Sequence, residues 1–260
     1  MKLVPFYLLS LILTNIPNLY ARAITGRSLV VYSTNEYDLC QNIRYLLVAS
    51  GIPFKELRFS YNGGSSNKFI SKILNMGYFV SDFPLLTDKY YNIRYLGDIN
   101  SIYIYLLSIY TRSLASYTIM KNSRSLQVNS FLNDFMSSII NNLRANNGNI
   151  LCKDILDIKN SDIYLGIIDN ALNNDGPFIG NKYITFVDIT LYSIVVLIEL
   201  VAPGCIKNKY PSITKMAKLL RNTEVISTYE DSRYFKSLII PGTNKFVRPI
   251  DFFTTNTDIY

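Results

Sequence analysis

Residues 29–54, which read LVVYSTNEYDLCQNIRYLLVASGIPF, decide the fold class of this chain. The run from Ser28 to Tyr32 is short and rich in β-branched residues, which predicts a strand. Apolar residues at helical spacing then predict a helix over residues 39–50, which Gly51 is placed to end. Residues 54–59 predict a second strand. Strand, helix and strand in this order are typical of a βαβ unit.

The same alternation continues to about residue 110. We expect a loop over residues 62–66, a helix over 67–75, two short strands over 84–86 and 92–96, and a helix over 100–110. Asp98 or Asn100 is placed to cap this last helix. The order of elements predicts a mixed sheet with helices packed on it.

The second half of the chain has helical periodicity throughout. Large apolar residues recur at every fourth position from Phe131 to Leu143, and further helices are expected over residues 154–171, 187–201 and 212–220. Thr185 and Asp188 precede an apolar run at the spacing of a capping box. We therefore predict an α/β domain over 27–111 and an all-helical domain over 112–240. The tail, 241–260, has no pattern that assigns it.

The composition excludes several kinds of chemistry. The chain has 260 residues and no histidine, which excludes Ser-His-Asp and Cys-His catalysis and histidine-ligated zinc or haem, so no metal site is expected. The 26 basic and 19 acidic residues are scattered, and the basic ones form no cluster of the kind that binds nucleic acid. The three cysteines lie far apart without a CxxC motif, so we expect no disulfide framework.

Residues 1–23 have the pattern of a secretory signal peptide. A single early lysine precedes a short apolar run, and Ala21 and Ala23 provide the small residues before a cleavage point. We expect a mature chain that begins at Ile24 and enters the secretory pathway; an uncleaved membrane anchor is the alternative. Residues 189–202 are also apolar, but they are too few for a span and include Glu199, which favours a buried core helix.

Three patterns, in the right order and spacing, resemble the glutathione transferase family. They are Leu29–Tyr32 with IRYLL at 43–47, FPLL at 83–86 followed by Asp98, and GPFIG at 176–180 followed by Thr185 and Asp188. The resemblance covers roughly residues 27–235 and is closest to the tyrosine-type, sigma-like members. It implies a thioredoxin-like N-terminal domain, an all-helical C-terminal domain and a homodimer.

The resemblance also implies a reaction. In such enzymes a tyrosine at the end of the first strand donates a hydrogen bond to the glutathione sulfur and favours its thiolate, which attacks an apolar electrophile. Tyr32 would have this role here, with Tyr37 as the alternative and Ser33 as a weaker one; Tyr32 could equally be a packing residue. Cys40, at a helix start, could itself be a nucleophile or only a small buried residue. Glutathione would be a co-substrate, and no further cofactor is expected.

The resemblance assigns the glutathione-binding residues as well. Pro84 would follow a cis peptide bond that leaves the Phe83 backbone able to bind the peptide, whereas an ordinary turn proline is the alternative. Asp98 would pair with the glutamyl ammonium, and Lys72 could reach the glycyl carboxylate. Ile99 stands where many members have serine, so the glutamyl carboxylate would depend on backbone amides. A non-catalytic protein on the same scaffold, binding hydrophobic ligands or a protein partner, is the alternative function.

Overall fold

The N-terminal half forms a four-stranded mixed sheet. The computed structural model describes residues 29–61, 63–111, 114–115 and 119–248, so the predicted leader lies outside the described residues. The strands are β1 (Leu29–Thr34), β2 (Lys55–Phe59), β3 (Leu85–Asp88) and β4 (Ile93–Leu96), in the order β2-β1-β3-β4. β2 is parallel to β1, and β3 is antiparallel to both β1 and β4.

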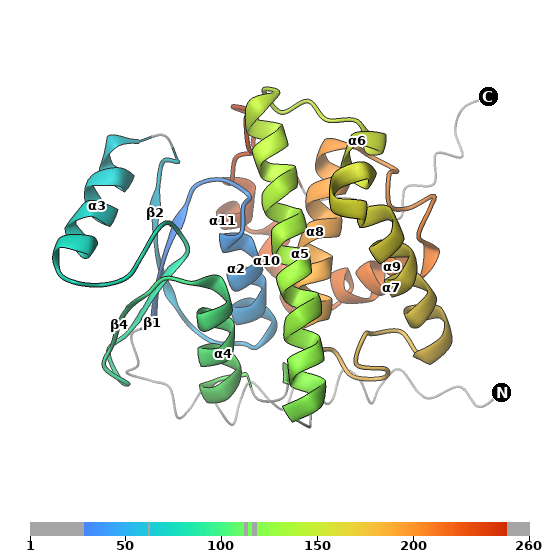
Figure 1. Cartoon of the computed structure of the whole chain (residues 1–260), viewed down its shortest axis with the longest axis horizontal. Helices are drawn as coiled ribbons and strands as arrows, with labels where there is room; N and C mark the ends of the chain where they lie inside the picture. The colour runs from blue at the N-terminus through green and yellow to red at the C-terminus, as the bar shows by residue number, and fades with distance from the viewer. Residues whose placement is uncertain (1–28, 62, 112–113, 116–118, 249–260) are drawn as a thin grey trace.

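Helices cover both faces of the sheet (Figure 1). α2 (Cys40–Ala49) and α4 (Ile99–Ile109) pack on the face that presents Val31 and Leu86, and α3 (Gly64–Asn75) packs on the face that presents Tyr32 and Leu85. This division follows from the strand geometry, because successive side chains point to opposite faces. The predicted mixed sheet with packed helices is therefore confirmed.

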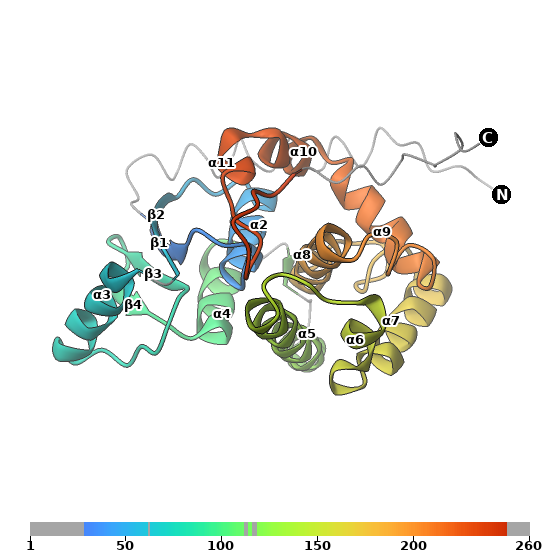
Figure 2. The same cartoon turned by 90° about the horizontal axis from the view of Figure 1, so that it is seen from above.

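The C-terminal half is helical, as predicted. Its helices are α5 (Ile119–Ala145), α6 (Cys152–Asp157), a 3₁₀ turn η2 (Ile158–Asn160), α7 (Ser161–Asp175), α8 (Phe186–Val201), α9 (Pro211–Arg221), α10 (Glu224–Asp231) and α11 (Arg233–Lys236). α8 lies at the centre, surrounded by α2, α5, α7, α9 and α10 (Figure 2). Its residues 186–198 are all buried. No described helix is both long and apolar enough to cross a membrane.

A capping box begins α8, as the sequence predicts. The Asp188 carboxylate accepts hydrogen bonds from the Thr185 N–H at 2.8 Å and from the Ile179 N–H at 2.7 Å. Burial raises the pKa of Asp188 to about 6, although these hydrogen bonds oppose the shift. The motif thus holds the segment before α8 onto the start of the buried helix.

Buried polar bonds join the two halves across α2. The Asn42 amide donates to the Asn133 side-chain oxygen at 2.9 Å, and the Tyr45 hydroxyl donates to the Glu230 carboxylate at 2.7 Å. Both bonds run from α2 to the helical half. Because all four residues are buried, these bonds fix the orientation of α2 against α5 and α10.

Three helix predictions are wrong in detail. The single helix expected over 154–171 is broken by Lys159 and Asn160, which both have left-handed backbones, at φ 48° and 59°. Helix α3 begins at Gly64, inside the expected loop, because the Ser66 N–H and hydroxyl both bond the Gly63 carbonyl. Helices α10 and α11 are too short to be recognised from periodicity.

The prediction of no disulfide framework is also wrong. Cys152, at the start of α6, is bonded to Cys205, in the loop after α8, across 53 positions of sequence. Spacing along the chain carries no information on this pair, because the helical packing brings the two Cα atoms to 5.4 Å. Cys40 is the free cysteine of the described chain, and it is buried.

The segment just before the unassigned tail lies against the first loop of the chain, and part of the tail pairs with this segment. The Tyr37 N–H donates to the Ile239 carbonyl at 2.8 Å, and the Ile239 N–H donates to the Asn35 carbonyl at 3.0 Å. Ile239 also forms an antiparallel bridge with Phe246. The segment after α11 therefore covers the loop between β1 and α2.

Candidate functional site

The Phe83–Pro84 loop enters the sheet just before β3. Its peptide bond is cis, as predicted, and Pro84 is buried while Phe83 is half-buried. The Phe83 N–H donates to the exposed Asp82 carboxylate at 2.7 Å. A peptide ligand that bound the Phe83 N–H would have to displace this side chain.

Tyr32 lies on the α3 face of the sheet. Its ring stacks on Phe69 with centroids 5.1 Å apart and lies 5.8 Å from the ring of Tyr95. Burial raises the pKa of Tyr32 and a hydrogen bond with Thr87 opposes the rise. The hydroxyl is therefore protonated at neutral pH and able to donate.

Tyr32 and Phe83 belong to one aromatic cluster. Phe83 stacks on Phe59 with centroids 5.0 Å apart, and Phe59 stacks on Phe69 at 4.8 Å. The ring of Phe69 thus lies between those of Tyr32 and Phe83. We did not predict the roles of Phe59 and Phe69; their position on β2 and on the apolar stripe of α3 is the signal that places them on this face.

Asp98, Ile99 and Lys72 are the residues predicted to bind the charged groups of glutathione. Asp98 caps α4, accepting the Ser101 N–H at 2.7 Å, and its carboxylate is exposed. Ile99 is half-buried and packs against the main core. Lys72 is exposed in the last turn of α3, and within the described residues it makes no ion pair. The structure therefore brings Phe83 and Tyr32 into one cluster, and among the described residues neither Asp98 nor Lys72 forms a hydrogen bond or an ion pair with it.

The alternative activating residues are enclosed. The Tyr37 hydroxyl is fully buried and donates to the Ser193 carbonyl at 2.9 Å, and burial raises its pKa well above the ordinary value. The Ser33 hydroxyl is buried and donates to Glu56 at 2.5 Å. Burial also raises the pKa of the Cys40 thiol, which disfavours a thiolate. All three positions favour a structural role.

A buried ionic network, which was not predicted from the sequence, fixes the end of β1. Arg44 on α2 is fully buried; its Nε lies 2.6 Å from the Glu56 carboxylate, and its Nη2 donates to the Thr34 carbonyl at 2.7 Å. Arg58 pairs with the other oxygen of Glu56 at 2.8 Å. Burial opposes ionisation of Glu56, but the two guanidiniums hold its pKa below the ordinary value. The sequence does contain a signal for this network: Arg44 stands within the apolar stripe of a helix, and an arginine is rarely buried unless it is paired.

Comparison with known proteins identifies the scaffold. The family described as "Glutathione S-transferase, C-terminal domain" matches residues 133–233. No protein of curated function matches the sequence.

Three solved structures are similar to the chain. NaGST-2 matches with a TM-score of 0.65 at 15% identity, over 80% of this chain and 97% of its own. Prostaglandin synthase D of Nilaparvata lugens matches with a TM-score of 0.62 at 20% identity, over 79% of this chain and 98% of its own. Rat hPGDS, solved in complex with a quinoline, matches with a TM-score of 0.61 at 19% identity, over 78% of this chain and 95% of its own. The chain therefore has the two-domain glutathione transferase fold, with a thioredoxin-like domain followed by a helical domain.

Proposed function

We propose that this chain is a glutathione transferase-like protein that binds glutathione at the Phe83–Pro84 loop. The observation that carries the proposal is a thioredoxin-like domain followed by the helical domain of a glutathione transferase, with the Phe83–Pro84 loop entering the sheet just before β3. The Phe83 backbone would hold the cysteinyl part of the tripeptide as an added strand. Asp98, which is exposed, would pair with the glutamyl ammonium, and Lys72 with the glycyl carboxylate.

If the protein is also an enzyme, it would conjugate the bound glutathione to an apolar electrophile. Tyr32 is the proposed donor to the sulfur, since its hydroxyl is the one among Tyr32, Tyr37 and Ser33 that is not fully enclosed. Such an activity would serve detoxification. The second candidate is a non-catalytic binder on the same scaffold. It is favoured by the isoleucine at position 99, where many members of the family have serine.

Replacing Tyr32 by phenylalanine separates the two forms. If Tyr32 activates the thiol, Tyr32→Phe keeps retention on immobilised glutathione and lowers turnover about 10–100-fold, because one donor to an anion is worth roughly 1.5–3 kcal/mol. Elution by free glutathione and initial rates with several apolar electrophiles measure both properties. Tyr37→Phe is the matched control, expected to change turnover much less.

Two outcomes decide against parts of the proposal. Retention without any rate above the uncatalysed reaction would leave only the non-catalytic binder. Failure of the wild type to bind immobilised glutathione would reject glutathione as the ligand.

The secretory assignment is part of the proposal. The pattern of residues 1–23 motivates it, and the Cys152–Cys205 bond supports it, because disulfides persist mainly in oxidising compartments. An oxidising compartment holds little reduced glutathione, which is a further reason to test binding apart from turnover.

A homodimer is the proposed assembly, and Phe79 is the side chain that we expect it to bury. Phe79 is 100% exposed in the loop before Pro84, and Leu74 and Met76 nearby are 48% and 49% exposed. Burying a phenylalanine is worth roughly 1.5–3 kcal/mol, so Phe79→Ser should weaken dimerisation at least about tenfold. Light scattering over a concentration series measures this. Phe246→Ser, at a phenylalanine that is 62% exposed, is the control; a stable wild-type monomer at micromolar concentration would contradict the proposal.

A further inference from the structure

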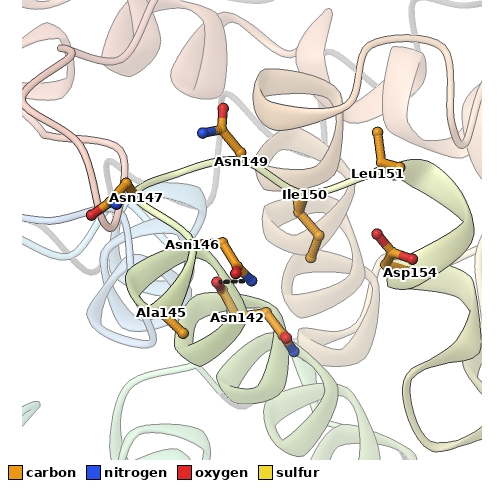
Figure 3. Close-up of a pocket in the computed structure, with 8 residues that line it drawn as sticks. All are labelled: Asn142, Ala145, Asn146, Asn147, Asn149, Ile150, Leu151 and Asp154. Atoms are coloured by element: carbon orange, nitrogen blue, oxygen red, sulfur yellow. Dashed lines mark hydrogen bonds between the residues drawn. The ribbon is translucent and has the colours of Figure 1, made fainter.

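A polar hollow lies in the helical half between α5 and α6 (Figure 3), two elements that Figure 2 shows well apart from β3. It has a volume of about 590 Å³ and lies between the last turns of α5, the loop after it and the first turn of α6. Asparagines at positions 142, 146, 147 and 149 contribute much of its lining, and Asp154 faces them from α6. No basic side chain lines it within the described residues.

The helix orients two of these amides. The Asn142 Nδ2 donates to the Ser138 carbonyl at 2.9 Å, and the Asn146 Nδ2 donates to the Asn142 carbonyl at 3.0 Å. Each side chain therefore has its own carbonyl oxygen and one N–H left for another molecule. Both residues are exposed.

The remaining polar groups of the hollow are not used within the described chain. Asn147 and Asn149 are exposed and their side chains make no hydrogen bond there, and the Asp154 carboxylate makes no ion pair. The lining thus combines donors and acceptors on the amides with one acceptor-only carboxylate. Ile150 and Leu151 add an aliphatic edge, and Leu151 is 61% exposed.

The rim of the hollow is held in place from two sides. The Gly148 N–H donates to the Leu143 carbonyl at 2.7 Å, and its φ of 80° is one that glycine adopts without strain. A Cβ at Gly148 would lie 2.0 Å from the Thr243 side chain, so the turn packs closely on the C-terminal segment. On the other side, the Cys152–Cys205 bond fixes the start of α6. The backbone that carries the polar side chains is therefore held in place, which lowers the entropy that must be lost when a ligand binds.

We propose that this hollow binds the hydroxyl groups of a neutral saccharide. A side-chain amide can donate to one hydroxyl and accept from its neighbour, and a carboxylate can accept from two. The aliphatic edge suits the C–H face of a sugar ring. An anion would meet Asp154 without any basic partner, and an apolar ligand would leave the amides unpaired. A cationic ligand would meet a single carboxylate in a chain whose net charge is +7.

Titration of isotope-labelled protein with glucose, mannose and N-acetylglucosamine, followed by NMR, tests the proposal. At least one sugar should give saturable shifts confined to residues 142–154, with a dissociation constant on the order of millimolar. Asn142→Ala and Asp154→Ala should each weaken binding about five- to tenfold, the effect of losing one or two hydrogen bonds. Asn173→Ala and Asp157→Ala are the controls, exposed polar residues outside the hollow that should leave binding unchanged.

Three results would overturn the proposal. They are the absence of saturable shifts up to about 100 mM of every sugar, well above the millimolar range expected, equal weakening by the control variants, and tighter binding of spermidine than of any sugar at the same residues. Glutathione binding is not part of this readout, so the proposal stands or falls apart from the proposed function.

Discussion

Arg44→Met is expected to lower the free energy of unfolding by about 3–5 kcal/mol, because it leaves a buried carboxylate without the closer of its two cationic partners. Glu56 is almost fully buried, and Arg44 lies 2.6 Å from it. Methionine fills most of the space of the arginine side chain but donates no hydrogen bond, so the Thr34 carbonyl also loses its donor. Urea denaturation followed by circular dichroism measures the change.

The double variant Arg44→Met/Glu56→Gln is the control for this prediction. It removes both charges of the pair, so it should be more stable than Arg44→Met alone by about 1–3 kcal/mol. Arg58, the other partner of Glu56, is 17% exposed and can be solvated. Additive losses in the two single variants and the double variant would show that Arg44 acts by packing and not by pairing.

Removing the disulfide is the second change with a large expected effect. Cys152→Ala/Cys205→Ala should lower the free energy of unfolding by about 4 kcal/mol, the chain-entropy value for a closed loop of this length. Without the crosslink the unfolded chain has more conformational entropy than the unfolded wild type, which stabilises the unfolded state. Thermal and urea denaturation of the oxidised wild type and of the variant give the difference.

Two observations check the assignment of the bond itself. Wild type unfolded without reductant should show a single reactive thiol, that of Cys40. Reduced wild type should match the stability of the double variant. Three reactive thiols in oxidised, unfolded protein would contradict the bond, and Cys40→Ala should then leave two.

Local patterns predict most of the elements, and the reasons are visible in particular residues. The period of the apolar residues marks β1, α2 and α8, and the box of Thr185 and Asp188 marks where α8 begins. The break at Lys159 and Asn160 was not predicted, because no glycine or proline marks it in the sequence although both residues have left-handed backbones.

The candidate site was less predictable than the fold. The cis bond before Pro84 was predicted from the resemblance. Which tyrosine side chains are exposed could not be predicted, because exposure depends on how the whole chain packs. Tyr32 and Tyr37 are both tyrosines near the end of one strand, yet Tyr37 is enclosed by α8 and by the C-terminal segment. The pairing of Cys152 with Cys205 and that of Arg44 with Glu56 join separate elements, so neither could be read from local spacing.

The hydrogen bonds between Ile239 and the loop after β1 have a consequence for synthesis. A polypeptide is made from its N-terminus, and domains generally fold as units when their residues have emerged. The partners of Asn35 and Tyr37 lie about two hundred positions later, near the end of the described chain. The first loop of the N-terminal domain therefore stays open until Ile239 has been made, and a chain that stops before this residue would expose the loop to proteases and chaperones.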